Sequence, residues 1–289
     1  MLVWLNGRFV AARDATVSAL DRGVLHGDGV YDTWRTYGGV PFAVAAHVRR
    51  IAGAARTLGL PRPGDARAWE RRSRALVARC GLRDAAVRLT ITRGAAGDAL
   101  VPVRGPRPTV LLTARPLPAD LARRQTNGIA AVLLPFPRDA SAAWGHMKLV
   151  GHASAVVGRV AAARRGAAEG LYVTPAGDVT EATSANVFVV EGNRLVTPPL
   201  AAGVLPGVTR ALVLAVARRL GVHVREERLP LARVRRAREI FLTGSTVELL
   251  PVVRLDGRRV GDGVPGAATR RLQAAYAARV AAALARARL

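Results

Sequence analysis

The sequence predicts an α+β protein with two domains, a small N-terminal α/β domain at residues 1–117 and a larger C-terminal domain at residues 118–289. Three observations lead to this prediction. The length of 289 residues suits two domains of ordinary size. Segments with strand patterns and segments with helical patterns alternate along the chain. A connector with two prolines, Pro116–Asp120, separates two such series.

The N-terminal series begins with strands joined by tight turns. Asn6-Gly7 and Gly38-Gly39 are typical of hairpin turns, because both pairs tolerate positive φ. Prolines and a glycine in Leu60–Gly64 end the first long helix. The predicted strands are Met1–Val10, two within Tyr31–Phe42, Ala86–Arg93 and Pro108–Arg115, and the predicted helices are Val44–Leu58 and Ala66–Arg79.

The C-terminal series mixes both kinds of element. Asp256-Gly257 is typical of a hairpin turn within Arg254–Arg258. The chain closes with a long helix rich in alanine and arginine, from about Ala268. The predicted strands are Ile129–Phe136, Gly170–Thr174, Ala185–Glu191, Val222–Arg228 and Glu239–Thr243, and the other helices are Val150–Arg165, Thr209–Leu220 and Leu231–Ala237. We infer two mixed domains with a cleft between them.

The composition excludes several classes of protein. Half of the residues are hydrophobic, which excludes a disordered chain. Cys80 is the only cysteine, which excludes an internal disulfide and a cysteine-ligated zinc site, and we predict no metal. We find neither an apolar run of membrane-spanning length nor a signal peptide, so we expect a cytoplasmic protein without a membrane partner.

The charge of the chain is strongly positive. It has 44 basic and 20 acidic residues, a formal net charge of +24. The arginines are scattered through every segment, and aromatic residues, on which nucleic-acid bases stack, make up only 4%. We therefore predict a solvated basic surface and no specific nucleic-acid partner, and keep a non-catalytic basic binding protein as a remote alternative.

Of the 44 basic residues, 43 are arginine and only one, Lys148, is lysine. Arginine replaces lysine on most surfaces, but its guanidinium cannot form a Schiff base near neutral pH. Covalent chemistry with a carbonyl compound or with pyridoxal phosphate is therefore one explanation for this lysine. Chance retention of a single surface lysine is the other.

The sequence after Lys148 favours the first explanation. Glu181 lies between two predicted strands, where a carboxylate could keep a pyridine nitrogen protonated. Gly203–Arg210 opens a helix whose N-terminal amides, with Thr209, could bind a phosphate. Phe241–Thr246 follows a strand and offers further small donors. Taken one at a time, these features are better explained as a turn carboxylate and an ordinary helix cap; together they favour a cofactor site.

Together, these residues resemble the class IV (fold-type IV) pyridoxal-phosphate enzymes. That family includes branched-chain aminotransferases, D-amino-acid aminotransferases and aminodeoxychorismate lyases. The resemblance covers nearly the whole chain. Its motifs are Asp21–Gly23, Gly27–Asp32, His47–Arg50, Val179–Glu181, Ser184–Phe188, Thr197–Leu200, Leu205–Arg210 and Phe241–Gly244.

The resemblance implies a role for each matching residue. Lys148 would form the Schiff base and move the substrate proton, and Glu181 would pair with the pyridine nitrogen. Leu205 would pack on the ring, and Tyr31 would lie in the substrate pocket. It also implies a barrel-like C-terminal domain, a cofactor between the domains and a homodimer. The phosphate would be held by Arg50, Val208, Thr209, Ser245 and Thr246.

The resemblance indicates the cofactor more clearly than the substrate. The segment after Thr92–Gly94 lacks the arginine and histidine with which the well-known D-amino-acid aminotransferases bind the substrate carboxylate. Asp32–Tyr37 and Arg88 partly resemble branched-chain aminotransferases, so Arg35 and Arg88 are our candidates for the substrate carboxylate. We predict amino transfer between a branched-chain-like L- or a D-amino acid and a 2-oxo acid, with aminodeoxychorismate lyase as the alternative.

Overall fold

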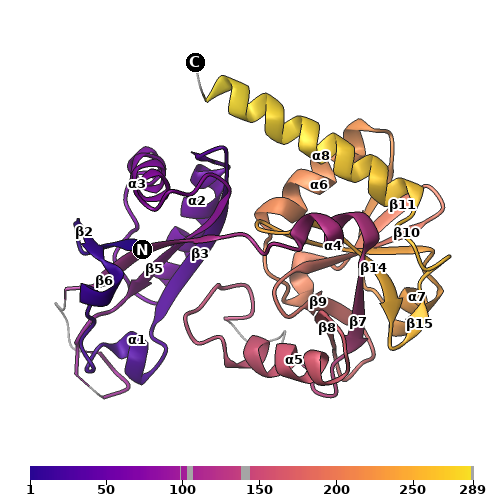
Figure 1. The fold of residues 1–289 in the computed structure, drawn as a ribbon. Coiled ribbons are helices and arrows are strands. Elements are labelled where there is room, and N and C mark those ends of the chain that lie inside the picture. Colours follow the sequence, from indigo (N-terminus) through magenta and orange to yellow (C-terminus); the bar gives the residue numbers. More distant parts are fainter. Residues whose placement is uncertain (98, 103–106, 138–143, 288–289) are drawn as a thin grey trace. The chain divides into compact units, whose positions relative to one another are not determined.

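The computed structural model describes residues 1–97, 99–102, 107–137 and 144–287. They form two compact units (Figure 1). The first unit contains the described parts of Met1–Leu117, the segment Met147–His152 and residues 283–287. The second contains the described parts of Pro118–His146 and Ala153–Ala282. Lys148, expected in the C-terminal part, thus belongs to the first unit, because its segment bonds to a strand of that unit.

The first unit contains an antiparallel sheet in the order β2-β1-β6-β5-β3-β4. Strand β3 pairs with β5 along nearly its whole length, with Thr33 opposite Arg88. Side chains alternate between the faces of a strand, so Val30, Asp32 and Trp34 point to one face of β3 and Tyr31 to the other. The strands are β1 (Leu2–Leu5), β2 (Arg8–Ala11), β3 (Gly29–Tyr37), β4 (Val40–Pro41), β5 (Ala85–Thr92) and β6 (Thr109–Pro116).

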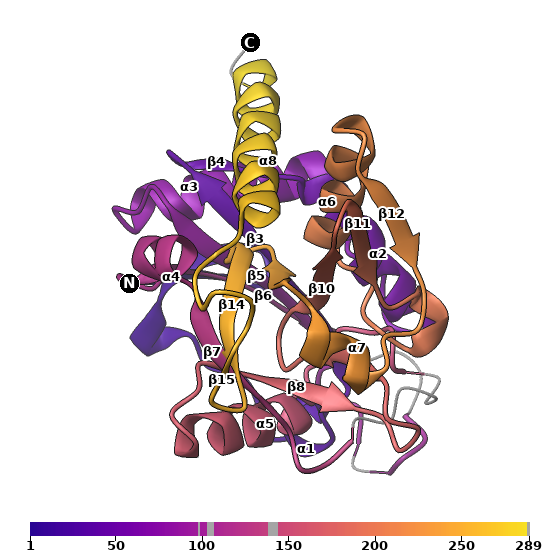
Figure 2. The same ribbon diagram turned by 90° about the vertical axis from the view of Figure 1, so that its right-hand side faces the viewer.

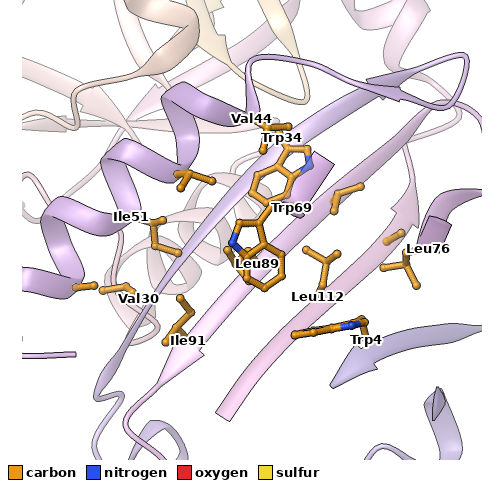
Figure 3. Packing of buried hydrophobic residues seen from close by; sticks show 14 of the residues in the cluster. Trp4, Val30, Trp34, Val44, Ile51, Trp69, Leu76, Leu89, Ile91 and Leu112 are labelled. Carbon is orange, nitrogen blue, oxygen red and sulfur yellow. The ribbon is translucent and has the colours of Figure 1, made fainter. Parts of the chain in front are cut away.

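Helices cover one face of this sheet and form its hydrophobic core. Trp34 of β3, Leu89 of β5 and Trp69 of a helix are all buried there (Figure 3). The Asp65 carboxylate caps the helix that carries Trp69 by accepting from the amide of Ala68. The opposite face of β3 is left for Tyr31. The helices are α1 (Arg22–Leu25), α2 (Val44–Thr57) and α3 (Ala66–Arg79), with a 3-10 turn, η1 (Ala12–Asp14).

The second unit contains a mixed sheet that closes on itself. Among the described residues, the order β10-β13-β14-β7-β8-β9 returns to β10 through the pair Asn186 and Glu181. The result is a small barrel filled by apolar side chains. The strands are β7 (Ile129–Leu133), β8 (Glu169–Val173), β9 (Val179–Ala182), β10 (Asn186–Glu191), β11 (Arg194–Thr197), β12 (His223–Glu226), β13 (Glu239–Gly244), β14 (Glu248–Leu255) and β15 (Arg258–Arg259).

Most helices of the second unit lie around this barrel, as Figure 2 shows from a second side. In the part of the chain that the structure describes, none of them has both the length and the apolar composition needed to cross a membrane. The helices of this unit are α4 (Leu121–Asn127), α5 (Ala153–Arg164), α6 (Val208–Arg219), α7 (Leu231–Arg236) and α8 (Ala267–Arg286), with a 3-10 turn, η2 (Leu200–Ala202).

Most predicted elements are confirmed, and the differences have local causes. Helix α5 begins at Ala153, three residues later than predicted, because the amide of Val150 donates to the carbonyl of Gly29 instead of entering the helix. The sequence analysis missed α1, α4, β9 and β11, and reduced the long strand β14 to the hairpin at its end. Glu181, expected between two strands, lies within β9. The two-domain α+β class with a barrel-like part is confirmed.

Candidate active site

The main chain around Lys148 runs beside β3 in the first unit. The amide of Tyr31 donates to the carbonyl of Lys148 at 2.9 Å, and Leu149 forms an isolated bridge with Val30. Gly29 permits this approach, because a Cβ there would lie 3.0 Å from Cγ2 of Val150 and 2.8 Å from the carbonyl oxygen of Ile91. The backbone on both sides of Lys148 is thereby fixed to the sheet.

Tyr31 lies against two cationic side chains. The ring centroid is 3.7 Å from Cζ of Arg88 and 4.6 Å from Nζ of Lys148, within the range of cation–π interaction. Burial raises the pKa of Tyr31 to about 12, although the charge of Arg88 opposes the shift. The phenol is therefore neutral at physiological pH. The structure thus brings together Lys148 and two of the three predicted substrate residues, Tyr31 and Arg88.

The third, Arg35, lies further along β3. Its guanidinium carbon is 4.4 Å from the ring centroid of Tyr37. Strand alternation places Arg35 on the same face of β3 as Tyr31, four residues away. Arg35 therefore shares a face with the Tyr31 group, and its role there stays a prediction.

Arg50 is held by a buried carboxylate on the other face of β3. Nε and Nη2 of Arg50 donate to the two oxygens of Asp32 at 2.9 and 2.7 Å, and Nδ1 of His47 lies 2.8 Å from the same carboxylate. Burial alone would raise the pKa of Asp32, but His47 and Arg50 lower it well below its usual value. Burial lowers the pKa of His47, against the attraction of Asp32.

In the second unit, Glu181 is held from two directions. Its Oε2 accepts from the amide of Leu205 at 3.0 Å and from Nδ2 of Asn186 at 3.3 Å. Asn186 also donates to the carbonyl of Leu205 at 2.9 Å. Gly207 allows Asn186 this position, because a Cβ on Gly207 would lie 2.1 Å from its Oδ1. A buried carboxylate is thereby fixed beside the segment that opens α6.

The predicted phosphate-binding residues of this unit lie at two chain turns. Val208 and Thr209 are the first residues of α6, where the free amides and the helix dipole favour an anion. Ser245 and Thr246 lie in the turn from β13 to β14. Thr243, just before this turn, has a buried hydroxyl that makes no hydrogen bond within the described part of the chain. Thr243 also pairs with Asn186 across the strands.

The sequence analysis did not identify three residues that hold predicted site residues in place. Asp32 and His47 hold Arg50, and Asn186 holds both Glu181 and Leu205. The three-residue spacing of His47 and Arg50 on one helix was a usable signal, because such residues share a face. The described residues contain no cluster of three or more side chains suited to a metal ion.

Comparison with known proteins identifies the family that this chain resembles in sequence and structure. The family model for amino-transferase class IV matches residues 29–255. A putative branched-chain-amino-acid aminotransferase of Methanocaldococcus jannaschii is 33% identical, over 94% of each chain. D-alanine aminotransferase of Bacillus licheniformis is 30% identical, over 95% of each chain. The crystal structure of Escherichia coli branched-chain amino acid aminotransferase has a TM-score of 0.89 at 29% identity, over 94% of this chain and 92% of that one.

The fold, the family match and the curated relatives show an enzyme of the aminotransferase class. The chain belongs to the class IV aminotransferases, since the family model covers most of its length. Class IV aminotransferases use pyridoxal 5′-phosphate (PLP) as their cofactor.

Proposed function

We propose that this enzyme binds PLP through Lys148 and moves amino groups between a branched-chain L-amino acid and a 2-oxo acid. The position of Lys148 carries the proposal, because its Nζ lies 4.6 Å from the ring centroid of Tyr31, the ring that also contacts Arg88. An amine and a carboxylate-binding group therefore adjoin one aromatic ring. The similarity to the branched-chain enzymes of M. jannaschii and E. coli supports the substrate class.

The residues present suit PLP in both charge and hydrogen bonding. Glu181 is a fixed, buried carboxylate, which is the partner that a protonated ring nitrogen needs. Arg50 is oriented by Asp32, and the first turn of α6 offers free amides, so both suit a phosphate. We assign the phosphate to Arg50 and to four residues of the second unit, namely Val208, Thr209, Ser245 and Thr246. Leu205 would pack against the ring.

Bound PLP supplies an electron sink that stabilises negative charge at the α-carbon of an amino acid. Lys148 would hold the cofactor covalently through its amine, and the same Nζ, once freed from the cofactor by the amino group of the substrate, would serve as the general base that takes the α-proton. Glu181 holds a proton at the ring nitrogen. Arg88 and Arg35 bind the substrate carboxylate, and Tyr31 remains a neutral wall of the pocket.

We also propose that the enzyme is a homodimer. Helix α5 exposes Val156, Val157 and Val160 on one face, and a contiguous apolar stripe on a helix favours a protein interface. Val157→Arg is expected to shift the sedimentation coefficient towards that of a monomer. Val264→Arg is the matched control, because Val264 is also exposed but lies outside α5. Sedimentation of both variants as the unmodified protein does would contradict the role of α5.

Absorbance and covalent trapping test the cofactor. The purified protein with added PLP is expected to show a visible band, which borohydride removes, and peptide mapping is expected to place the adduct on Lys148. A colourless protein, or an adduct at the N-terminal amine alone, would overturn the proposal. Salt-resistant nucleic-acid binding by a colourless protein would revive the remote alternative of a basic binding protein.

A substrate panel tests the reaction. We expect oxo-acid formation from L-leucine, L-isoleucine and L-valine that depends on an added 2-oxo acid. Preference for D-alanine would overturn the assigned stereochemistry. Pyruvate release from aminodeoxychorismate without an amino acceptor would identify a lyase instead.

A further inference from the structure

Glu169 is a buried carboxylate to which the proposed reaction gives no role. It is the first residue of β8 and is 3% exposed. Its Oε2 accepts from Nη1 of Arg159 at 2.5 Å and from Oγ of Ser184 at 3.1 Å. Its Oε1 accepts from Oγ1 of Thr183 and, at 3.1 Å, from the amide of Gly170. Burying a carboxylate costs free energy unless donors surround it in this way.

The hydroxyl donors come from one short turn. Thr183 and Ser184 lie in the connection from β9 to β10, which is closed by a hydrogen bond from the amide of Ala182 to the carbonyl of Ala185 at 2.8 Å. Glu181 lies two residues before Thr183, and Asn186 lies two residues after Ser184. The carboxylate of Glu169 therefore holds the turn between the two residues that make the Glu181 hydrogen-bond group.

The same carboxylate connects this turn to α5. Arg159 belongs to α5, which lies beside β8 (Figure 1). The helix approaches the turn closely at Gly158, where a Cβ would lie 2.7 Å from Cγ2 of Thr183. A hydrogen bond from the hydroxyl of Tyr172 to the carbonyl of Ser154, at 2.9 Å, fixes the start of α5 to β8 as well. The turn thus has a rigid support on one side.

We infer that Glu169 is a positioning residue, which orients Glu181 by holding the Thr183–Ser184 turn. This inference rests on the proposed role of Glu181 towards the PLP ring. An apolar residue at position 169 could fill the space, but it would leave two hydroxyls and an arginine without their acceptor. The carboxylate supplies a fixed geometry for the turn, and the geometry of the turn sets that of Glu181 and Asn186.

A double-mutant cycle tests whether Glu169 acts through Glu181. Glu169→Gln keeps the shape of the side chain but removes the charge that Arg159 and Ser184 contact. We expect it to weaken PLP binding about tenfold, the lower end of the losses that follow removal of a residue supporting a metal ligand, and to shift the pH midpoint of the visible band. In a Glu181→Gln background, the same change is expected to alter PLP affinity by less than about twofold, because a residue that acts through Glu181 has no carboxylate left to position, whereas the effects of independent sites would add.

Two further variants separate positioning from simple loss of stability. Glu239→Gln is the matched control, since Glu239 caps α8 in the same unit through Ala268 and Thr269. It is expected to lower stability without moving the pH midpoint of the band. Ser184→Ala removes a single donor to Glu169 and provides the test if Glu169→Gln does not fold. It is expected to shift the midpoint in the same direction.

The outcomes distinguish the two proposals. If the unmodified protein binds no PLP, the proposed function fails. If it binds PLP but Glu169→Gln weakens binding equally in both backgrounds, Glu169 serves only the fold and the positioning role is wrong. The same conclusion follows if Glu169→Gln and Ser184→Ala leave the affinity and the pH midpoint unchanged.

Discussion

Lys148 and Tyr31 are joined twice in the first unit. The amide of Tyr31 donates to the carbonyl of Lys148 at 2.9 Å, and Nζ of Lys148 lies 4.6 Å from the centroid of the Tyr31 ring. The backbone hydrogen bond fixes the position of the Lys148 main chain. The contact with the Tyr31 ring limits the positions that Nζ of Lys148 can take. Strand β3 therefore sets the position of the proposed nucleophile.

Replacement of Lys148 by arginine is expected to abolish covalent cofactor attachment while retaining the positive charge. Arginine cannot form a Schiff base, and loss of proton transfer alone lowers kcat by about 10²–10⁴-fold. Steady-state kinetics with L-leucine and borohydride trapping measure the two effects. An undiminished kcat in Lys148→Arg would contradict the assigned role.

Tyr31→Phe is expected to change how stability depends on pH in the alkaline range. The folded-state pKa of Tyr31 is about 12, whereas an unperturbed phenol has a pKa of about 10. The folded state thus binds the phenol proton more tightly, and this contribution to stability is complete below about pH 10 and is lost as the pH rises towards 12. From pH 10 to 12 the unmodified apoprotein should lose about 2 kcal/mol more than Tyr31→Phe in urea unfolding. If the free energies of unfolding of the two proteins fell in parallel between pH 10 and 12, the pKa of Tyr31 would not be raised by folding.

Asp32→Asn is expected to lower the free energy of unfolding by about 3–5 kcal/mol, because it removes the buried carboxylate that pairs with Arg50 and with the buried His47. The lowered pKa of Asp32 adds a pH effect: its contribution is present above about pH 4 and is lost as the pH falls below that value. The variant should therefore lose less stability than the unmodified protein on acidification. Urea unfolding at several pH values measures both effects.

Asp14→Asn is the control for that comparison. Asp14 faces Arg13 at 3.7 Å on the surface, and an exposed pair of this kind contributes under about 1 kcal/mol. A loss of stability in Asp32→Asn no larger than in Asp14→Asn would contradict the importance of the buried group.

Gly207→Ala is expected to disturb Glu181 indirectly. The φ of Gly207 is −66°, so the backbone accepts alanine, but the added Cβ would lie 2.1 Å from Oδ1 of Asn186. Displacing Asn186 should cost about 1–3 kcal/mol of stability and weaken PLP binding. Gly53→Ala in α2 is the matched control, because nothing lies within 4 Å of its Cβ and alanine favours a helix. Equal PLP affinity in the two variants would show that Asn186 does not position Glu181.

The sequence predicts the fold better than the composition of the candidate site. Apolar periodicity and turn signals locate α2, α3 and β10 closely, because burial imposes those patterns. The same signals miss β11, whose four residues, Arg194–Thr197, are too few to show a period. The position of Lys148 beside β3 depends on hydrogen bonds between residues more than a hundred positions apart, and no local pattern encodes them. The sequence analysis does not identify Glu169 for the same reason, since the donors to its carboxylate come from α5 and from the Thr183–Ser184 turn.

The barrel of the second unit closes where β9 meets β10, and the pair described there consists of Asn186 and Glu181. The strand pair of the barrel with the fewest register partners among the described residues thus also contains the proposed partner of the ring nitrogen. A molecule that binds Glu181 stabilises the closed barrel against unfolding in proportion to the logarithm of its concentration. Proteases cleave unfolded segments, so bound cofactor is expected to slow proteolysis of this protein.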